Sequence, residues 1–279
     1  MSKFNRYILL SSFLFLNFNC KSVHQNSSTK VTDGARIYWK SEGDSELIKK
    51  IKLKILKSLV RLIRPSGSTC TATLVASDRL LTAAHCFPDS GPISAIFNNE
   101  TQVEGFTNSE RPTPQITFSL ADAVLNEYDP HKRPDNDIAV VRLPNPENIP
   151  NFYEPIKLLG KDVEIQEKSA VIVAGFGRLN STTTTEHPYF GIMSIEKFQS
   201  EDSQIVLHPP EGKNTNLCNG DSGGPTLIYD SNADELYQIG VNVLGSCDKI
   251  DEIGDRRPIA YSNDIRKYHD WITVALLTD

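Results

Sequence analysis

The feature that most restricts the fold of this 279-residue chain is a series of short apolar runs separated by turn residues. These runs are bounded by Gly, Pro, Asn, Asp or Ser, a pattern typical of strands joined by tight turns. The runs are Leu59 to Ile63, Ala72 to Val75, Ile116 to Leu120, Ile138 to Leu143, Ala170 to Val173, Ile192 to Ile195, Thr226 to Ile228 and Tyr237 to Leu244. The sequence therefore predicts an all-β fold, with 39% hydrophobic residues to fill its core.

One stretch, from Asp44 to Lys57, does not follow this pattern of short apolar runs. A capping aspartate followed by apolar residues at helical spacing predicts a short amphipathic helix. The alternation of apolar residues from Ile51 to Ile55 leaves a strand as the alternative. The basic residues of this stretch are Lys49, Lys50, Lys52, Lys54 and Lys57. We favour a surface helix with a solvated basic face over one that lies on an anionic membrane.

The string from Cys218 to Pro225, Cys-Asn-Gly-Asp-Ser-Gly-Gly-Pro, carries the strongest chemical signal. Three glycines and Asp221 around Ser222 suit a tight turn that exposes one hydroxyl and aims neighbouring N–H groups at a common point. A serine hydroxyl is a weak nucleophile unless a base takes its proton. The string therefore predicts a nucleophile that needs a histidine and a carboxylate elsewhere in the chain.

Both partners occur upstream of Ser222. His85 lies in Thr-Ala-Ala-His-Cys, a setting of small and apolar residues, and Asp137 opens an apolar strand in Asp-Asn-Asp-Ile-Ala-Val-Val-Arg-Leu. The order His85, Asp137, Ser222 and all three strings resemble the trypsin/chymotrypsin family of serine peptidases, from about Leu59 to Trp271. The resemblance implies an endopeptidase that cleaves protein or peptide substrates through an acyl-enzyme, with no cofactor and no metal.

The resemblance also implies a chymotrypsin-like fold of two antiparallel Greek-key barrels, each six-stranded, with a C-terminal α-helix. We expect a signal peptide at 1–20, a tether or pro-segment at 21–30 and a peptidase domain at 31–279. The barrels are expected at about 58–154 and 155–262, and Gly175-Phe176-Gly177 resembles a family turn near the start of the second barrel. Apolar residues at helical spacing predict the closing helix at about 263–276.

In the family, the backbone N–H groups at the positions of Gly220 and Ser222 bind the oxyanion. Two positions depart from the family pattern. Val243 stands where the family has a serine that donates to the aspartate, and Leu244 replaces the usual tryptophan. We expect Asp137 to have one donor fewer, which affects the rate rather than the class of reaction.

For specificity, the resemblance places Asn216 at the floor of the substrate pocket, neutral where trypsin-like enzymes carry an aspartate. Ile259 at the wall would shorten the pocket, and Gly245 keeps its entrance open. The expected substrate-binding residues are Asn216, Leu217, Asn219, Val243, Leu244, Gly245 and Ile259. They favour small to medium uncharged side chains on the acyl side of the cut. Alternatively, the segment from Asp248 to Arg257 supplies another pocket.

Cysteine use indicates export to an oxidising compartment. Apart from Cys20 the chain has an even four cysteines, and the family resemblance implies the pairs Cys70 with Cys86 and Cys218 with Cys247.

An apolar core from Tyr7 to Leu16 follows Lys3 and Arg6, which is typical of an export signal. Cys20 follows where a bacterial lipoprotein carries its lipidated cysteine, so anchoring of a bacterial envelope protein through this residue is one interpretation. A plain cleaved signal, with the protein periplasmic or secreted, is the other.

An activation cut after Lys30 would create a new N-terminus at Val31 that pairs with Asp221, as in zymogens of the family. A cut before Ile37 and an ordinary linker turn remain as alternatives.

A net charge of -6 disfavours a nucleic-acid partner, and we expect a monomer. Two other functions stay open. One is a non-catalytic binding or adhesion protein on this fold. The other is a membrane-active protein that works through Lys49 to Lys57.

Overall fold

The computed structural model describes residues 46–87, 91–98, 113–132, 134–178, 186–199, 203–210, 215–245 and 259–278. The expected signal segment, Cys20, Val31 and Cys247 lie outside these residues, as does the segment from Asp248 to Arg257.

The described helices and strands are α1 Glu46–Leu56, β1 Leu59–Ile63, β2 Thr69–Ala76, β3 Arg79–Thr82, β4 Ile93–Phe97, β5 Gln115–Phe118, β6 Ala123–Leu125, β7 Ala139–Arg142, β8 Lys157–Leu158, β9 Ala170–Gly175, β10 Tyr189–Gln199, β11 Gln204–His208, β12 Pro225–Asp230, β13 Glu235–Leu244, β14 Ala260–Asp264 and α3 His269–Leu277. All eight apolar runs lie largely within strands, so the all-β prediction is confirmed.

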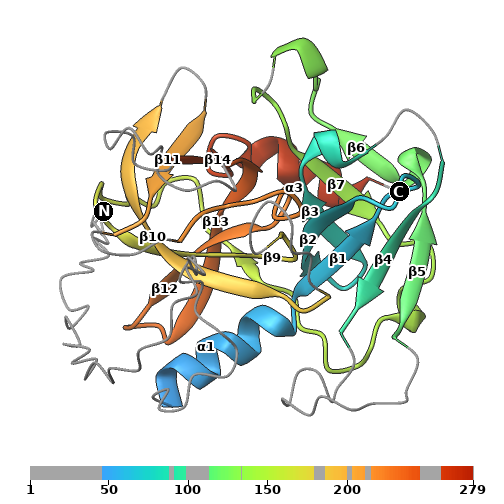
Figure 1. Cartoon of the computed structure of the whole chain (residues 1–279), viewed down its shortest axis with the longest axis horizontal. Helices are drawn as coiled ribbons and strands as arrows, with labels where there is room; N and C mark the ends of the chain where they lie inside the picture. The colour runs from blue at the N-terminus through green and yellow to red at the C-terminus, as the bar shows by residue number, and fades with distance from the viewer. Residues whose placement is uncertain are drawn as a thin grey trace, which may run out of the picture.

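Two sheets form the body of the molecule and lie side by side in Figure 1. The first has the order β5-β4-β1-β2-β3-β7-β6. β5 and β6 follow each other in the chain, and a short turn at Leu120–Asp122, capped by Ser119, separates them. β5 pairs with β4 at one end of this order, and β6 pairs with β7 at the other end. β5 and β6 together therefore act as one interrupted strand, the sixth strand of a barrel.

The second sheet has the order β12-β9-β10-β11-β14-β13-β8, with an additional pairing between β12 and β13. That pairing joins the two ends of the six-stranded order from β12 to β13 and closes a barrel. The two-residue β8 adds to its edge in parallel with β13. The six-stranded expectation therefore holds for both barrels once β5 and β6 are taken together and β8 is counted as an addition.

The C-terminal helix α3 packs against the first barrel. Ile272 and Ala275 of α3 belong to the same buried apolar cluster as β1, β2 and β7. The helix begins at His269, later than the expected start at 263, because Asn263 and Asp264 extend β14 and pair with Val241 and Gly240 of β13. The sequence prediction of the helix start was therefore wrong.

Helix α1 confirms the predicted amphipathic helix and lies below the second barrel in Figure 1. Ile51 and Ile55 pack into an apolar cluster with Phe190, Leu227 and Leu236 of that barrel. In the described residues, no helix combines the length and apolar character that a membrane crossing needs.

The lysines of this stretch bind the protein's own carboxylates. Lys50 pairs with Asp234, and Lys54 donates to Glu235 at 2.7 Å. Lys57 donates to Glu154 at 2.7 Å, while Lys49 pairs with Glu46 of its own helix. Hydrogen bonds from Lys157 and Lys54 lower the pKa of the Glu235 carboxyl to about 2.

The fifth lysine, Lys52, is buried, and its ammonium lies 5.8 Å from the centre of the Phe190 ring. Burial lowers the pKa of its amino group. The arrangement of these lysines argues against a helix whose basic face rests on a membrane.

Candidate active site

His85 lies just after β3, in a short 3-10 turn at Ala84–Cys86. The disulfide between Cys70 and Cys86 ties this turn to β2, with a Cα–Cα distance of 6.1 Å, so the first predicted bridge is confirmed. Cys218 is also disulfide-bonded, and its predicted partner Cys247 lies outside the described residues.

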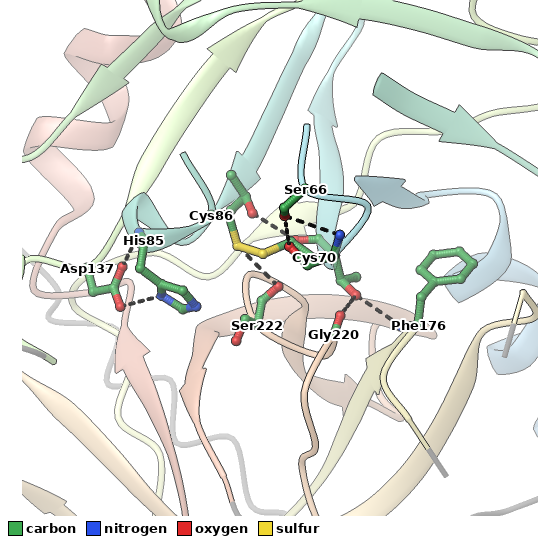
Figure 2. Close-up of a disulfide and its surroundings, with 11 residues drawn as sticks. Ser66, Cys70, His85, Cys86, Asp137, Phe176, Gly220 and Ser222 are labelled. Atoms are coloured by element: carbon green, nitrogen blue, oxygen red, sulfur yellow. Dashed lines mark hydrogen bonds and ion pairs between the residues drawn. A yellow bond between two sulfur atoms is a disulfide. The ribbon is translucent and has the colours of Figure 1, made fainter. Parts of the chain in front are cut away.

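Asp137 is fully buried and accepts two hydrogen bonds from His85. Its Oδ2 lies 2.7 Å from the ring Nδ1, and its Oδ1 accepts the backbone N–H of His85 at 2.8 Å (Figure 2). A tight turn presents the carboxylate, because Asn136 has φ 51° and the Ile138 N–H bonds to the Asn136 carbonyl at 2.8 Å. A carboxylate oxygen only accepts, so the imidazole tautomer that fits this contact carries its hydrogen on Nδ1.

The loop before β12 carries Ser222. Asp221 N–H donates to the Cys218 carbonyl at 2.9 Å, and Gly224 N–H donates to the Asp221 carbonyl at 3.0 Å, which closes two successive turns. Gly223 has φ +82°, and a Cβ there would lie 2.3 Å from the Thr71 carbonyl oxygen. Only glycine fits at this position, where the loop meets the first barrel.

The peptide between Asn219 and Gly220 has a defined orientation. The Arg178 N–H donates to the Asn219 carbonyl at 2.9 Å. In a trans peptide the N–H points away from the carbonyl, so the Gly220 N–H faces the opposite direction. Among the described residues, neither the Gly220 N–H nor the Ser222 N–H has a hydrogen-bond acceptor. Both donors are therefore available to a bound oxyanion.

Thr71, a buried residue of β2, holds this loop from the first barrel. Its hydroxyl donates to the Gly220 carbonyl at 2.7 Å and accepts the Phe176 N–H at 3.0 Å. Its backbone N–H donates to the Ser222 carbonyl at 2.8 Å. Sequence reasoning missed this residue, because a threonine in a strand gives no sign of a contact with a segment about 150 positions away.

The side chain of Ser222 is directed toward the imidazole of His85 in Figure 2, and no dashed line joins them. Of the hydrogen bonds formed by the described residues, none links these two side chains. Catalytic hydrogen bonds in ligand-free enzymes are commonly long and tighten when the substrate binds.

Asp221, the predicted partner of a new N-terminus, is buried beneath the nucleophile loop. Its carboxylate accepts the N–H of Gly177 at 2.8 Å and the N–H of Cys218 at 2.9 Å. A Cβ at Gly175 or Gly177 would come within 2.4 Å of this carboxylate, so both glycines are required for its placement.

The expected substrate-binding residues divide by exposure. Leu217 and Val243 are buried and pack in the two barrel cores, and Leu217 lines, together with Asn216, a cavity of only about 10 Å³. Asn219, Leu244 and Ile259 are exposed.

Close packing explains the glycine at position 245. Gly245 lies directly against Leu217, since an added Cβ would stand 2.5 Å from the leucine Cβ. The side chain of Asn216, at the expected pocket floor, accepts the Leu217 N–H at 2.8 Å.

Asn263 is a second residue that sequence reasoning missed. It is fully buried in β14, and its side-chain amide donates to the Asp137 carbonyl at 3.0 Å. The second barrel thereby holds the backbone of the aspartate, although Val243 brings no hydroxyl to its carboxylate.

Donor atoms of Cys70, His85 and Cys86 lie within 4.8 Å of one another, as in some metal sites. The two sulfur atoms are bonded to each other, so they offer no thiolate ligand.

Two barrels that bring a histidine, a buried aspartate and a glycine-framed serine together define a chymotrypsin-like protein. The family model described as Trypsin matches residues 56–272. This chain belongs to the trypsin family.

Its relatives include proteases. The chain is 28% identical over 218 residues to the collagenase of Hypoderma lineatum, covering 73% of this chain and 74% of that protein. It is 27% identical over 217 residues to the mouse transmembrane protease serine 11G, covering 73% of this chain but only 48% of that protein.

Solved structures show the same fold. Human heparin binding protein superimposes with a TM-score of 0.63 at 18% identity, covering 81% of this chain and 94% of that chain. At this identity the likeness extends to the fold alone.

Proposed function

We propose that this chain is an exported serine endopeptidase that uses Ser222, His85 and Asp137. The observation that carries the proposal is the pair of hydrogen bonds from His85 to buried Asp137, beside a serine loop with two unpaired N–H groups. This combination supplies a base, its orienting carboxylate, a nucleophile and an oxyanion site close together.

In the proposed mechanism, Nε2 of His85 takes the hydroxyl proton as Ser222 Oγ attacks the peptide carbonyl. Asp137 stabilises the imidazolium that forms, and the N–H groups of Gly220 and Ser222 bind the oxyanion. The imidazolium then protonates the leaving amine, which departs from an acyl-enzyme. Water, deprotonated by the same histidine, hydrolyses the ester and restores Ser222.

We further propose that the enzyme cleaves after small to medium uncharged residues. A buried arginine or lysine head beside neutral Asn216 would lack a counter-ion and lose several kcal/mol of solvation. The cysteines support an oxidising compartment, with Cys70 and Cys86 already bonded to each other.

The test is hydrolysis of a mixed peptide library by the wild-type chain and by His85→Ala and Ser222→Ala variants. The proposal expects endoproteolysis by the wild type alone, with all three proteins showing the same thermal unfolding. Equal hydrolysis by a pure Ser222→Ala sample would exclude Ser222 as the nucleophile.

A non-catalytic binding protein on the same fold is the second candidate, and the missing hydrogen bond between Ser222 and His85 favours it. This candidate predicts no hydrolysis by the wild type at any substrate concentration, before or after limited proteolysis.

A further inference from the structure

A cavity of about 340 Å³ lies at the outer face of the first barrel, with residues of β1 and β4 in its lining. Its lining includes Arg61 and Ile63 of β1, Ile96 of β4, Phe176 and Glu186. Arg61 and Ile63 stand two residues apart in β1 and therefore share one face, while Val60 and Leu62 point into the barrel core. The cavity thus combines apolar side chains with the Arg61 guanidinium, the Glu186 carboxylate and two further polar residues, Asn98 and Thr113.

The guanidinium of Arg61 has an incomplete set of partners. Its side chain is only 21% exposed, and its sole ion pair in the described part of the chain is with Glu186 at 4.0 Å. Glu186 is 85% exposed, so this contact is loose. The buried Nε of Arg61 has no hydrogen-bond partner. A mostly buried guanidinium with unused donors suits a carboxylate, which accepts two parallel N–H bonds from arginine.

Strand register places Arg61 close to the nucleophile loop. Arg61 pairs directly with Thr71 across β1 and β2, so both side chains project from the same face of the sheet. The Thr71 hydroxyl contacts both the Gly220 carbonyl and the Phe176 N–H. Phe176 also lines the cavity, so the oxyanion site and the cavity have a common wall.

The sheet order indicates the side of Ser222 on which the cavity lies. Along β4-β1-β2-β3, Arg61 lies on β1 and His85 follows β3, so they flank Thr71 and the serine from opposite sides. The expected acyl-side residues at the end of β13 pair with β14, whose Asn263 contacts Asp137. They therefore lie on the His85 and Asp137 side. The Arg61 cavity falls on the other side, toward the leaving group.

We propose that this cavity binds the carboxylate of a glutamate or aspartate on the carboxyl side of the scissile bond. The inference rests on the proposed peptidase function and adds a substrate preference to it. Neighbouring strands lie about 4.8 Å apart and an extended peptide rises about 3.3 Å per residue. Arg61 is one strand beyond Thr71, so the second or third residue after the cut reaches its guanidinium.

The test compares internally quenched peptides that are identical except for Glu, Gln or Lys at the second or third position after the cut. We expect kcat/KM of the wild type to be about tenfold higher for the Glu peptide than for the Gln peptide. Arg61→Gln should abolish this difference, and Arg61→Glu should favour the Lys peptide. Glu186→Gln, which removes the competing carboxylate, should increase the preference for Glu.

The matched control is Arg142→Gln, which removes an exposed arginine at the end of β7 and should keep the wild-type preference. Equal kcat/KM for the Glu and Gln peptides in the wild type would overturn the inference. This comparison needs no variant, so it decides the question even where Arg61→Gln fails to fold. A preference that survives in folded Arg61→Gln would overturn it as well.

A binding experiment separates this inference from the proposed function. Calorimetry with Ser222→Ala measures the affinity for the uncleaved peptides and does not depend on catalysis. Tighter binding of the Glu peptide supports the site even where the wild type hydrolyses nothing. Hydrolysis without any Glu preference, in kinetics or in binding, leaves the peptidase function standing and refutes the Arg61 site.

Discussion

The Thr71 hydroxyl links the two barrels at the nucleophile loop, and its removal is the most informative perturbation. Thr71→Val keeps a β-branched side chain but leaves the Gly220 carbonyl and the Phe176 N–H without their partner at 2.7 and 3.0 Å. Each buried group left unpaired costs about 1–3 kcal/mol. For the two groups together we therefore expect a loss of about 2–6 kcal/mol in the free energy of unfolding. For a domain of this size that corresponds to a fall in Tm of roughly 4 to 24 °C.

Activity should fall as well, because the Thr71 hydroxyl fixes the segment that aims the Gly220 N–H at the oxyanion. Full loss of one oxyanion donor costs about 100- to 1,000-fold in kcat. Loosening this donor should lower kcat about 10- to 100-fold while KM changes little, which steady-state kinetics with one peptide substrate can measure. Thr71→Ser, which keeps the hydroxyl, should restore most of kcat.

Thr73, two residues further along β2, provides the control. It is fully buried and its hydroxyl has no hydrogen-bond partner. Thr73→Val therefore removes an unpaired polar group, and it should leave the protein equally stable or stabilise it by about 1 kcal/mol. Equal effects of Thr71→Val and Thr73→Val on Tm and kcat would refute the role of the Thr71 hydroxyl.

Three further predictions concern the disulfide, the docking of α1 and the substrate pocket. Replacing both Cys70 and Cys86 by alanine opens a bridge between positions 16 residues apart and should cost about 3 kcal/mol, measured by denaturant unfolding. The Glu235 carboxyl has its pKa lowered from 4.5 to about 2, so its stabilising contribution is complete above pH 4.5 and is lost as the pH falls toward 2. The Tm of Glu235→Gln should therefore lie below that of the wild type at pH 7 and equal it near pH 2. A difference in Tm that stays the same from pH 7 to pH 2 would contradict a stabilising role of the ion pairs of Glu235. In a peptide library the wild type should prefer uncharged residues before the cut over Arg or Lys by at least about tenfold, or ~1.4 kcal/mol. Asn216→Asp should reverse that order, and dominant wild-type cleavage after Arg or Lys would refute the pocket assignment.

The sequence predicted those parts of the fold that depend on local pattern. The apolar runs marked eight strands and the amphipathic spacing marked α1, since side-chain periodicity follows directly from backbone geometry. The strands β3 and β11 have only two or three consecutive apolar residues and were not among the predicted runs, and pairing with neighbouring strands defines them. The start of α3 was misplaced for the same reason, because pairing with β13 keeps Asn263 and Asp264 in β14.

In the candidate site, clear sequence signals occur only where the chemistry needs rare residue strings. His85, Asp137 and Ser222 were found in this way. Thr71, Asn263 and Arg61 act through contacts between distant segments, and no local pattern distinguishes them from ordinary strand residues. Their roles follow from strand register, which a single sequence does not contain.

Labelling with a fluorophosphonate probe tests the central claim most directly, because such probes bond to a serine only when a base activates it and an oxyanion site binds the adduct. The chain is treated with the probe before and after limited proteolysis, and the modified residue is mapped by mass spectrometry. We predict modification at Ser222 alone, its loss in Ser222→Ala and in His85→Ala, and the same thermal unfolding for all three proteins. Modification elsewhere, or an unlabelled Ser222 in both samples of folded wild-type chain, would contradict the assignment.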